Sequence, residues 1–203
     1  MKRNLAVFFA VAVMILAALV GYPNAASTAQ QKKPTAKEKM ATIDYLVGSW
    51  SCGHTVGDFS GKYTSKYTKV LGDRWLKQTY DFPAGQFGGG NEPAVTGEAL
   101  IGFDEDWGQW VRFFATSHGE YFPIRMKETS NGWAYRYVSF FRSKPETADA
   151  DATFTKKSDT EYSIEGPTYP ENGKQVTEHH SCHKLSPNMA AGIFVGTDRQ
   201  LAD

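Results

Sequence analysis

Residues 95–117 read VTGEALIGFDEDWGQWVRFFATS, and this stretch decides the fold. Val95, Ala99, Ile101 and Phe103 share one face, opposite Glu98 and Asp104, as apolar residues do in a β-strand that buries one face. An acidic turn that ends in glycine follows, and a second segment rich in aromatic residues comes directly after it. The stretch therefore predicts two antiparallel strands joined by a short turn.

The same alternation of strand-like segments and turn residues continues on both sides of this hairpin. Val, Thr, Tyr, Phe and Trp are frequent in the segments, and Gly, Asn, Asp and Ser separate them. No convincing helical periodicity runs along the chain beyond the amino-terminal segment. The strands that this pattern predicts are Val47–Thr55, Lys62–Leu71, Arg74–Phe82, Val95–Asp104, Gln109–Ser117, Tyr121–Glu128, Trp133–Arg142, Ala150–Lys157, Glu161–Gly166 and Gln175–Leu185.

Short strands with hairpin-length connections predict an all-β protein built as an antiparallel meander. A long meander leaves its two outer edges unpaired, and closure into a barrel pairs them. We therefore expect an up-and-down β-barrel of about ten strands over residues 41–185. A two-sheet sandwich is the alternative.

The composition limits the classes of function. The chain has 203 residues, with 22 basic and 22 acidic side chains, so its formal net charge is zero. Proteins that bind nucleic acid need a basic surplus or a basic patch, and we expect no nucleic-acid partner here. The length suits one domain. The sequence predicts no particular oligomeric state.

Residues 1–26 have the organisation of a secretory signal peptide. Lys2 and Arg3 precede sixteen apolar residues, Leu5–Val20, and small residues follow through Ala29. An uncleaved membrane anchor is the alternative, but the apolar run is shorter than the ~20 residues that span a bilayer. Cleavage near residue 26 leaves 20 basic and 22 acidic side chains, a net charge of −2. We expect a periplasmic or secreted protein with no membrane span after cleavage.

Two segments flank the predicted barrel. Residues 27–40 hold Lys, Gln and small residues with few large apolar side chains, and we expect a solvated linker that runs into one helical turn before Ile43. Residues 186–203 form a predicted carboxy-terminal tail.

The two cysteines lie in the first and last predicted strands, Cys52 and Cys182. An exported protein with two cysteines is expected to pair them, and the first and last strands of a closed barrel are neighbours. Free thiols and a metal site with His54 and His180 are the alternatives. Residues two apart on a strand lie about 6.6–7 Å apart, which is wide for zinc chelation. We expect a disulfide and no metal.

Aromatic residues dominate the expected interior. Trp133, Tyr135, Tyr137 and Phe141 share one face of their strand. Each buried tyrosine hydroxyl needs a partner or water, and a barrel of about ten strands is wider than one that side chains alone can fill. These points favour a cavity, and a solid core of aromatic side chains is the alternative. If a ligand binds there, the residues that we expect to line its pocket are Trp50, Trp75, Phe103, Tyr135 and Tyr137.

The segment Gln109–Ser117 departs from simple alternation. Trp110 and Phe114 share a face with Arg112, and apolar residues also occupy the opposite face, including Phe113. This strand is therefore buried on both sides, or it carries an exposed apolar patch.

No catalytic motif accompanies the predicted barrel. The sequence has no Gly-x-Ser-x-Gly elbow and no His-Glu-x-x-His pair, and the glycines of 85–90 lack the lysine and helix of a phosphate loop. We therefore expect a binding protein for a small apolar molecule rather than an enzyme, without a cofactor.

Several short motifs resemble those of a bacterial family catalogued as domain of unknown function 1579. They are Leu46-Val47-Gly48-Ser49-Trp50, Gly72-Asp73-Arg74-Trp75-Leu76, Leu100-Ile101-Gly102-Phe103-Asp104 and Trp107-Gly108-Gln109-Trp110. The resemblance covers roughly Ala41–Leu185 and implies a lipocalin-like barrel in an exported protein. It implies no reaction and no catalytic residues.

Two alternative functions remain. Gly48 and Trp50 also resemble the opening of nitrobindin-like barrels, which bind haem or nitric oxide, and His180 or His183 would then be the axial ligand by position. Cys52-Gly53-His54 departs from the alternating glycines of that family. The other alternative is a structural or interaction protein of the envelope that uses exposed apolar strand faces.

Overall fold

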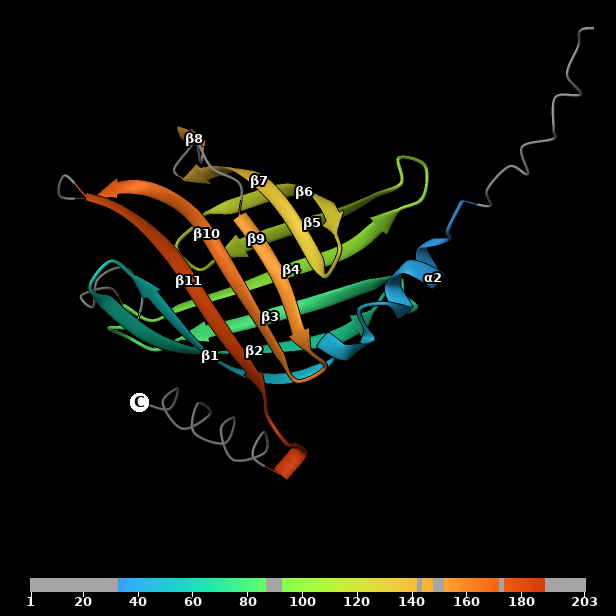
Figure 1. Ribbon diagram of the computed structural model, residues 1–203, viewed down its shortest axis with the longest axis horizontal. Coiled ribbons are helices and arrows are strands. Elements are labelled where there is room, and N and C mark those ends of the chain that lie inside the picture. The colour runs from blue at the N-terminus through green and yellow to red at the C-terminus, as the bar shows by residue number, and fades with distance from the viewer. Residues whose placement is uncertain (1–32, 87–92, 142–143, 148–151, 172–173, 189–203) are drawn as a thin grey trace, which may run out of the picture. The chain divides into compact units, whose positions relative to one another are not determined.

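The computed structural model describes residues 33–86, 93–141, 144–147, 152–171 and 174–188. Apart from short helices near the two ends of this range, these residues form strands (Figure 1). The strands are β1 Gly48–Val56, β2 Phe59–Val70, β3 Trp75–Phe82, β4 Val95–Asp104, β5 Gln109–Thr116, β6 Tyr121–Thr129, β7 Gly132–Phe141, β8 Lys144–Thr147, β9 Ala152–Ser158, β10 Glu161–Glu171 and β11 Lys174–Lys184. The all-β prediction is confirmed.

The strands pair in an order that closes the sheet on itself. The hydrogen-bonded order is β6-β5-β4-β3-β2-β1-β11-β10-β9-β7-β8, and β6 also pairs with β7. The β6–β7 pairing joins the two ends of this order, and the first and last long strands, β1 and β11, pair within it, so ten antiparallel strands form an up-and-down barrel. The predicted barrel is confirmed, and the sandwich alternative is wrong.

The short strand β8 lies outside this ring of ten strands and pairs with β7 alone among the described strands. It pairs with Val138–Phe141 of β7, whereas β9 pairs with Gly132–Tyr135 of the same strand. The sequence pattern missed β8 because four residues with a proline give almost no alternation to detect.

Strand β10 is longer than the expected segment Glu161–Gly166. Pro167 lies at a shift in the register between β10 and β11, where the ladder is interrupted between Glu165 and Thr168. Proline is tolerated at such a bulge because no ladder hydrogen bond is required of it there. Pairing then resumes and carries the strand to Glu171.

A short helix, α2 Ala36–Ala41, precedes the barrel and packs on it. Thr35 and Glu38 form a capping box at its start, and Met40 is buried. Residues 36–40, which the sequence assigned to the end of a linker, are helical in the structure. The isolated apolar side chain of Met40 was the only signal of this burial in a polar segment.

Large aromatic side chains fill the end of the barrel nearest α2. Trp50, Trp110, Trp133, Phe154 and Tyr162 are buried there, and neighbouring ring centroids lie 4.7–5.3 Å apart. These close contacts leave that end solid.

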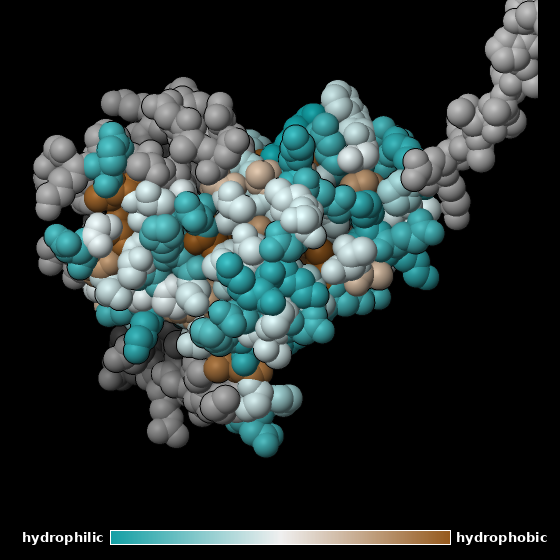
Figure 2. All heavy atoms as spheres, in the orientation of Figure 1, coloured by the Kyte–Doolittle hydropathy of each residue, from teal (hydrophilic) through white to brown (hydrophobic). Residues whose placement is uncertain are grey.

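The outward-facing side chains of β5 form an apolar area on the outside of the barrel. Phe113 is 54% exposed, and Trp75 of β3 lies with its ring centroid 6.5 Å from that of Phe113. Of the two interpretations of this strand, the exposed patch is the one that holds. The coloured part of the face visible in Figure 2 is mostly hydrophilic or neutral, with scattered apolar atoms.

Candidate ligand-binding cavity

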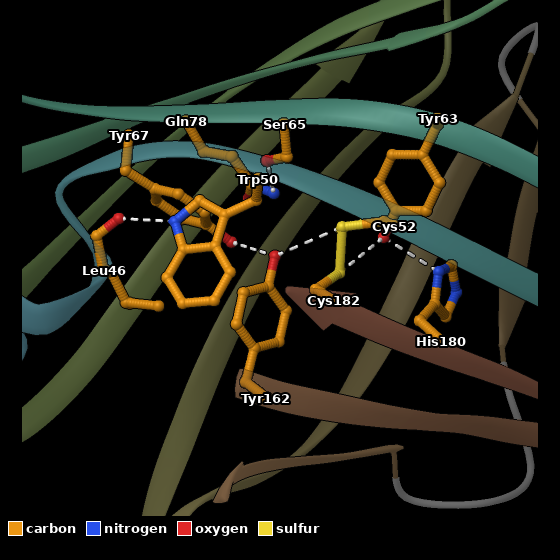
Figure 3. The surroundings of a disulfide bond; sticks show 10 residues. All are labelled: Leu46, Trp50, Cys52, Tyr63, Ser65, Tyr67, Gln78, Tyr162, His180 and Cys182. Carbon is orange, nitrogen blue, oxygen red and sulfur yellow. Dashed lines mark hydrogen bonds between the residues drawn. A yellow bond between two sulfur atoms is a disulfide. The ribbon is translucent and has the colours of Figure 1, made fainter. Parts of the chain in front are cut away.

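A disulfide links the two strands at which the meander begins and ends. Cys52 of β1 and Cys182 of β11 are register partners and form the bond (Figure 3). The disulfide prediction is confirmed, and the free-thiol and zinc alternatives are wrong. The bond spans a sequence separation of 130 residues, and it lies in the interior with both cysteines buried.

Tyrosines contact both sulfurs of the disulfide. The Tyr162 hydroxyl lies 3.8 Å from Cys52 Sγ, and the Tyr63 hydroxyl lies 3.7 Å from Cys182 Sγ. Because a disulfide sulfur carries no proton, the hydroxyls are the donors in these weak contacts. Tyr67 and Tyr162 are joined by a further hydrogen bond of 3.2 Å. The result is a row of polar side chains along the inner wall (Figure 3).

This row continues into a histidine–carboxylate pair. His180 Nδ1 lies 2.9 Å from the Tyr63 hydroxyl, and His180 Nε2 lies 2.9 Å from a Glu178 carboxylate oxygen. Burial raises the pKa of the Glu178 carboxyl, but the hydrogen bond and charge of His180, with help from His54, outweigh it and hold the pKa below its ordinary value. The lowered pKa favours an ionised Glu178 carboxylate that is hydrogen-bonded to His180.

The two histidines considered for haem do not fit that role. Both ring nitrogens of His180 are engaged, one by Tyr63 and one by Glu178. An axial ligand needs a ring nitrogen free to bind iron. His183 is exposed on the barrel wall, where it pairs in register with Ser51. The haem alternative finds no axial ligand at either position.

An arginine projects into the barrel interior, between the aromatic end and the opposite end. Arg112 lies on the inward face of β5, and its Nη2 donates a 2.9 Å hydrogen bond to the Gln78 side-chain oxygen. The Gln78 amide in turn donates to Ser65 Oγ at 3.0 Å. The guanidinium carbon is 5.1 Å from the Phe114 ring centroid, and the buried Nε of Arg112 has no acceptor among the described residues.

A cavity of about 260 Å³ lies in this part of the barrel interior. Its apolar wall consists of Phe82, Val95, Phe114, Ile124, Ala152 and Ile164. Its polar wall consists of Tyr63, Gln78, Tyr80, Arg112, Thr116, Glu120, Tyr135, Glu178 and His180. The interior is therefore hollow between the aromatic end and the opposite end of the barrel.

The tyrosines of the interior are neutral hydrogen-bond donors. Burial raises the pKa of Tyr63, Tyr80 and Tyr135 above its ordinary value, although the positive charge of Arg112 opposes this in each case. The Tyr80 hydroxyl is buried and has no hydrogen-bond partner within the described ranges. Its ring stacks on that of Phe114, with centroids 5.0 Å apart.

Of the five residues predicted to line a pocket, Tyr135 is the one that lines this cavity. Trp50 is fully buried in the aromatic end, where its ring nitrogen donates to the Leu46 carbonyl at 2.8 Å. Phe103 packs against the same end, beside Trp110. Tyr137 lies on β7, but its side chain is outside the described residues.

Trp75 lies on the outer face of the barrel and not in the cavity. Leu76, Gln78, Tyr80 and Phe82 are the buried residues of β3, so odd-numbered residues of this strand point outward. The ring of Trp75 lies over Gly102, its register partner, which has no side chain to obstruct it. The resemblance motif that contains Trp75 said nothing about which face the ring occupies.

The residues that reasoning from the sequence missed are the polar ones. Arg112 shares its strand face with Trp110 and Phe114, and a charged residue on an aromatic face was the available signal. Glu178 shares its strand face with the buried Cys182 and with His180, which the sequence singled out only as a candidate metal or haem ligand. Strand parity placed these side chains inward, but no motif marked them.

No family model matches the sequence, and no curated protein matches it. A solved structure that resembles the chain is that of Rv2717c from M. tuberculosis. The two share 13% sequence identity over 72% of this chain and 97% of that chain, with a TM-score of 0.48. A likeness at this level carries no argument, and membership of the family of unknown function 1579 stays a prediction.

Proposed function

We propose that this chain is an exported barrel protein that binds a small, largely apolar molecule in its interior cavity. The observation that carries the proposal is the cavity itself, about 260 Å³ in volume with an apolar wall. An apolar cavity of ~150 Å³ already binds benzene, and typical ligand pockets begin near ~300 Å³. The cavity suits a ligand between these sizes.

Export is supported by two independent features. The first 26 residues have the sequence organisation of a signal peptide, and the disulfide is of the kind that persists in oxidising compartments. Among the described residues, no helix is both long and apolar enough to cross a membrane.

A neutral fluorescent probe, N-phenyl-1-naphthylamine, tests the binding proposal with the oxidised mature protein. Ala152 is 1% exposed and lines the cavity, so Ala152→Leu places extra carbon atoms in the binding space. We expect fluorescence enhancement with the wild type and at least roughly ten-fold weaker binding to Ala152→Leu, since lost apolar contact of this size is worth about 1.4 kcal/mol.

Ala115→Leu is the matched control, because Ala115 is exposed on the outer face of β5. It should bind the probe as the wild type does. No binding by the wild type, or equal binding by the wild type and Ala152→Leu, would contradict the proposal. Circular dichroism of both variants checks that the barrel has folded.

A further inference from the structure

We propose that the cavity selects a small organic carboxylate and that Arg112 binds its anionic group. This inference rests on the proposed function, because it names the class of ligand for the same cavity. It follows from the charge of Arg112, from its unused donors and from the arrangement of the groups around it.

The first step concerns the positive charge. Arg112 projects into the barrel, and no Asp or Glu within 4.0 Å of its guanidinium is recorded among the described side chains. A guanidinium is charged at all relevant pH values, and a charge withdrawn from bulk water needs an opposite charge or several hydrogen bonds. Gln78 supplies a neutral acceptor and Phe114 a ring face. An anionic ligand would supply the missing counter-charge.

The second step concerns the donors. A guanidinium has five N–H groups, and Arg112 donates to the Gln78 side chain at 2.9 Å and is also hydrogen-bonded to the Tyr135 side chain. Its buried Nε–H has no acceptor among the described residues. The planar fork of N–H groups matches the two oxygens of a carboxylate. The Tyr80 ring stacks on the Phe114 ring, over which the guanidinium lies, and the buried Tyr80 hydroxyl has no partner in the part of the chain that the structure describes. Arg112 and Tyr80 thus present donors around one aromatic ring.

The third step concerns the carboxylates that line the cavity, Glu178 and Glu120. Glu178 is hydrogen-bonded to His180 at 2.9 Å. Glu120 lies beyond the end of β5, where its carbonyl accepts from the Thr116 amide. Among the described side chains, neither carboxylate forms an ion pair with Arg112.

The fourth step concerns the rest of the ligand. Ile124 is the register partner of Arg112 on β6, and Ala152 and Ile164 also line the cavity. An apolar group the size of a phenyl ring fits the ~150 Å³ that such a group needs, and the remaining volume accommodates a short linker and the carboxylate. An aryl-alkanoate is the simplest molecule with these properties.

Calorimetry with 3-phenylpropanoate and its neutral amide, 3-phenylpropanamide, tests the inference on the oxidised mature protein at neutral pH. The two probes have the same shape and differ in charge. We expect the acid to bind roughly 10- to 100-fold more tightly, because a charge-assisted bidentate contact is lost in the amide. Equal affinities would overturn the inference even if no variant were made.

Arg112→Met keeps the length of the aliphatic stem and removes the charge, and it should reduce binding of the acid to the level of the amide. Arg125→Met is the matched control, because Arg125 is exposed on β6 with its guanidinium over Trp107. Undiminished acid binding by Arg112→Met would contradict the role of Arg112.

The two proposals fail in different ways. Binding of the amide with no preference for the acid would overturn the inference about carboxylates and leave the proposed function standing. Failure of the acid, the amide and the neutral fluorescent probe to bind would overturn both the inference and the proposed function.

Discussion

The hydrogen bond between Glu178 and His180 shows how a single residue links charge to stability. The Glu178 pKa is held below its ordinary value of 4.5. A carboxyl whose pKa is depressed by folding adds stability above the unfolded-state pKa, and this stability is lost as the pH falls through the folded-state pKa. Glu128, which accepts hydrogen bonds from Lys39 and Trp110, has a pKa lowered in the same direction. Both residues therefore predict loss of stability in acid.

Glu178→Gln should reduce the free energy of unfolding by roughly 1–3 kcal/mol at neutral pH, because it removes a charged partner of His180. The difference from the wild type should shrink as the pH falls below about 4.5, where the wild-type carboxylate takes up a proton. Urea unfolding at pH 7, 5, 4 and 3 measures this. Glu165→Gln, on an exposed residue of β10, is the control. A difference that does not change with pH would contradict the assignment.

At the same scale, the sequence placed most side chains on the correct face and misjudged a few for identifiable reasons. Alternation put Tyr135 inside, and it lines the cavity. Trp75 was predicted to line the pocket, but Leu76 and Gln78 lie on the buried face of β3, so Trp75 faces outward. Arg112 was noticed on an aromatic face, but a single sequence does not show that the face is hollow beside it.

Helix α2 is the element whose contribution is easiest to isolate. Thr35 Oγ1 accepts from the Glu38 amide at 3.2 Å, and the Thr35 amide donates to the Glu38 carboxylate at 2.8 Å. Lys39 forms an ion pair with Glu128 of β6, and the Ala36 amide donates to Glu105 at 2.6 Å. These contacts hold a helix of six residues that could not persist alone.

Thr35→Ala should lower the free energy of unfolding by ~1 kcal/mol, because the amide of Glu38 loses its capping acceptor. Thr35→Ser preserves the acceptor and is the matched control. Thermal unfolding followed by circular dichroism should place the Ser variant near the wild type and the Ala variant below it. Equal midpoints for Ala and Ser would show that the cap does not support the helix.

The strand elements were predictable where turn residues mark their ends. All ten expected strands are present, most with ends within a few residues of the expected positions. The two largest differences involve proline. The expected segment ended at Gly166, the residue before Pro167, but the bulge accommodates this proline and β10 continues. Strand β8, which also contains a proline, was too short to recognise. Helix α2 was expected only as a single turn within a linker.

For the molecule as a whole, closure depends on pairing between distant parts of the chain. β1 and β11 are joined both by their backbone ladder and by the disulfide between Cys52 and Cys182. Their adjacency followed from closure of a meander, which is why the bond was predictable. The position of the cavity was not predictable, because it depends on how far the aromatic end fills the interior.

Replacing both cysteines by alanine should reduce the free energy of unfolding by about 4–5 kcal/mol, since the unfolded chain regains the entropy of a long open loop. The barrel should still form, because the ladder between β1 and β11 remains. Urea unfolding of the oxidised wild type and the double variant measures the difference. A double variant as stable as the oxidised wild type would contradict a stabilising role for the bond.

The central claim is that the barrel interior is a binding site, and a crystal structure with 3-(4-bromophenyl)propanoate tests it most directly. The anomalous signal of bromine locates the apolar end of the ligand independently of any fitted model. We predict a bromine peak inside the barrel among Ile124, Ala152 and Ile164, with the carboxylate at Arg112. An interior without ligand, or bromine bound only at the outer patch around Trp75 and Phe113, would contradict the account.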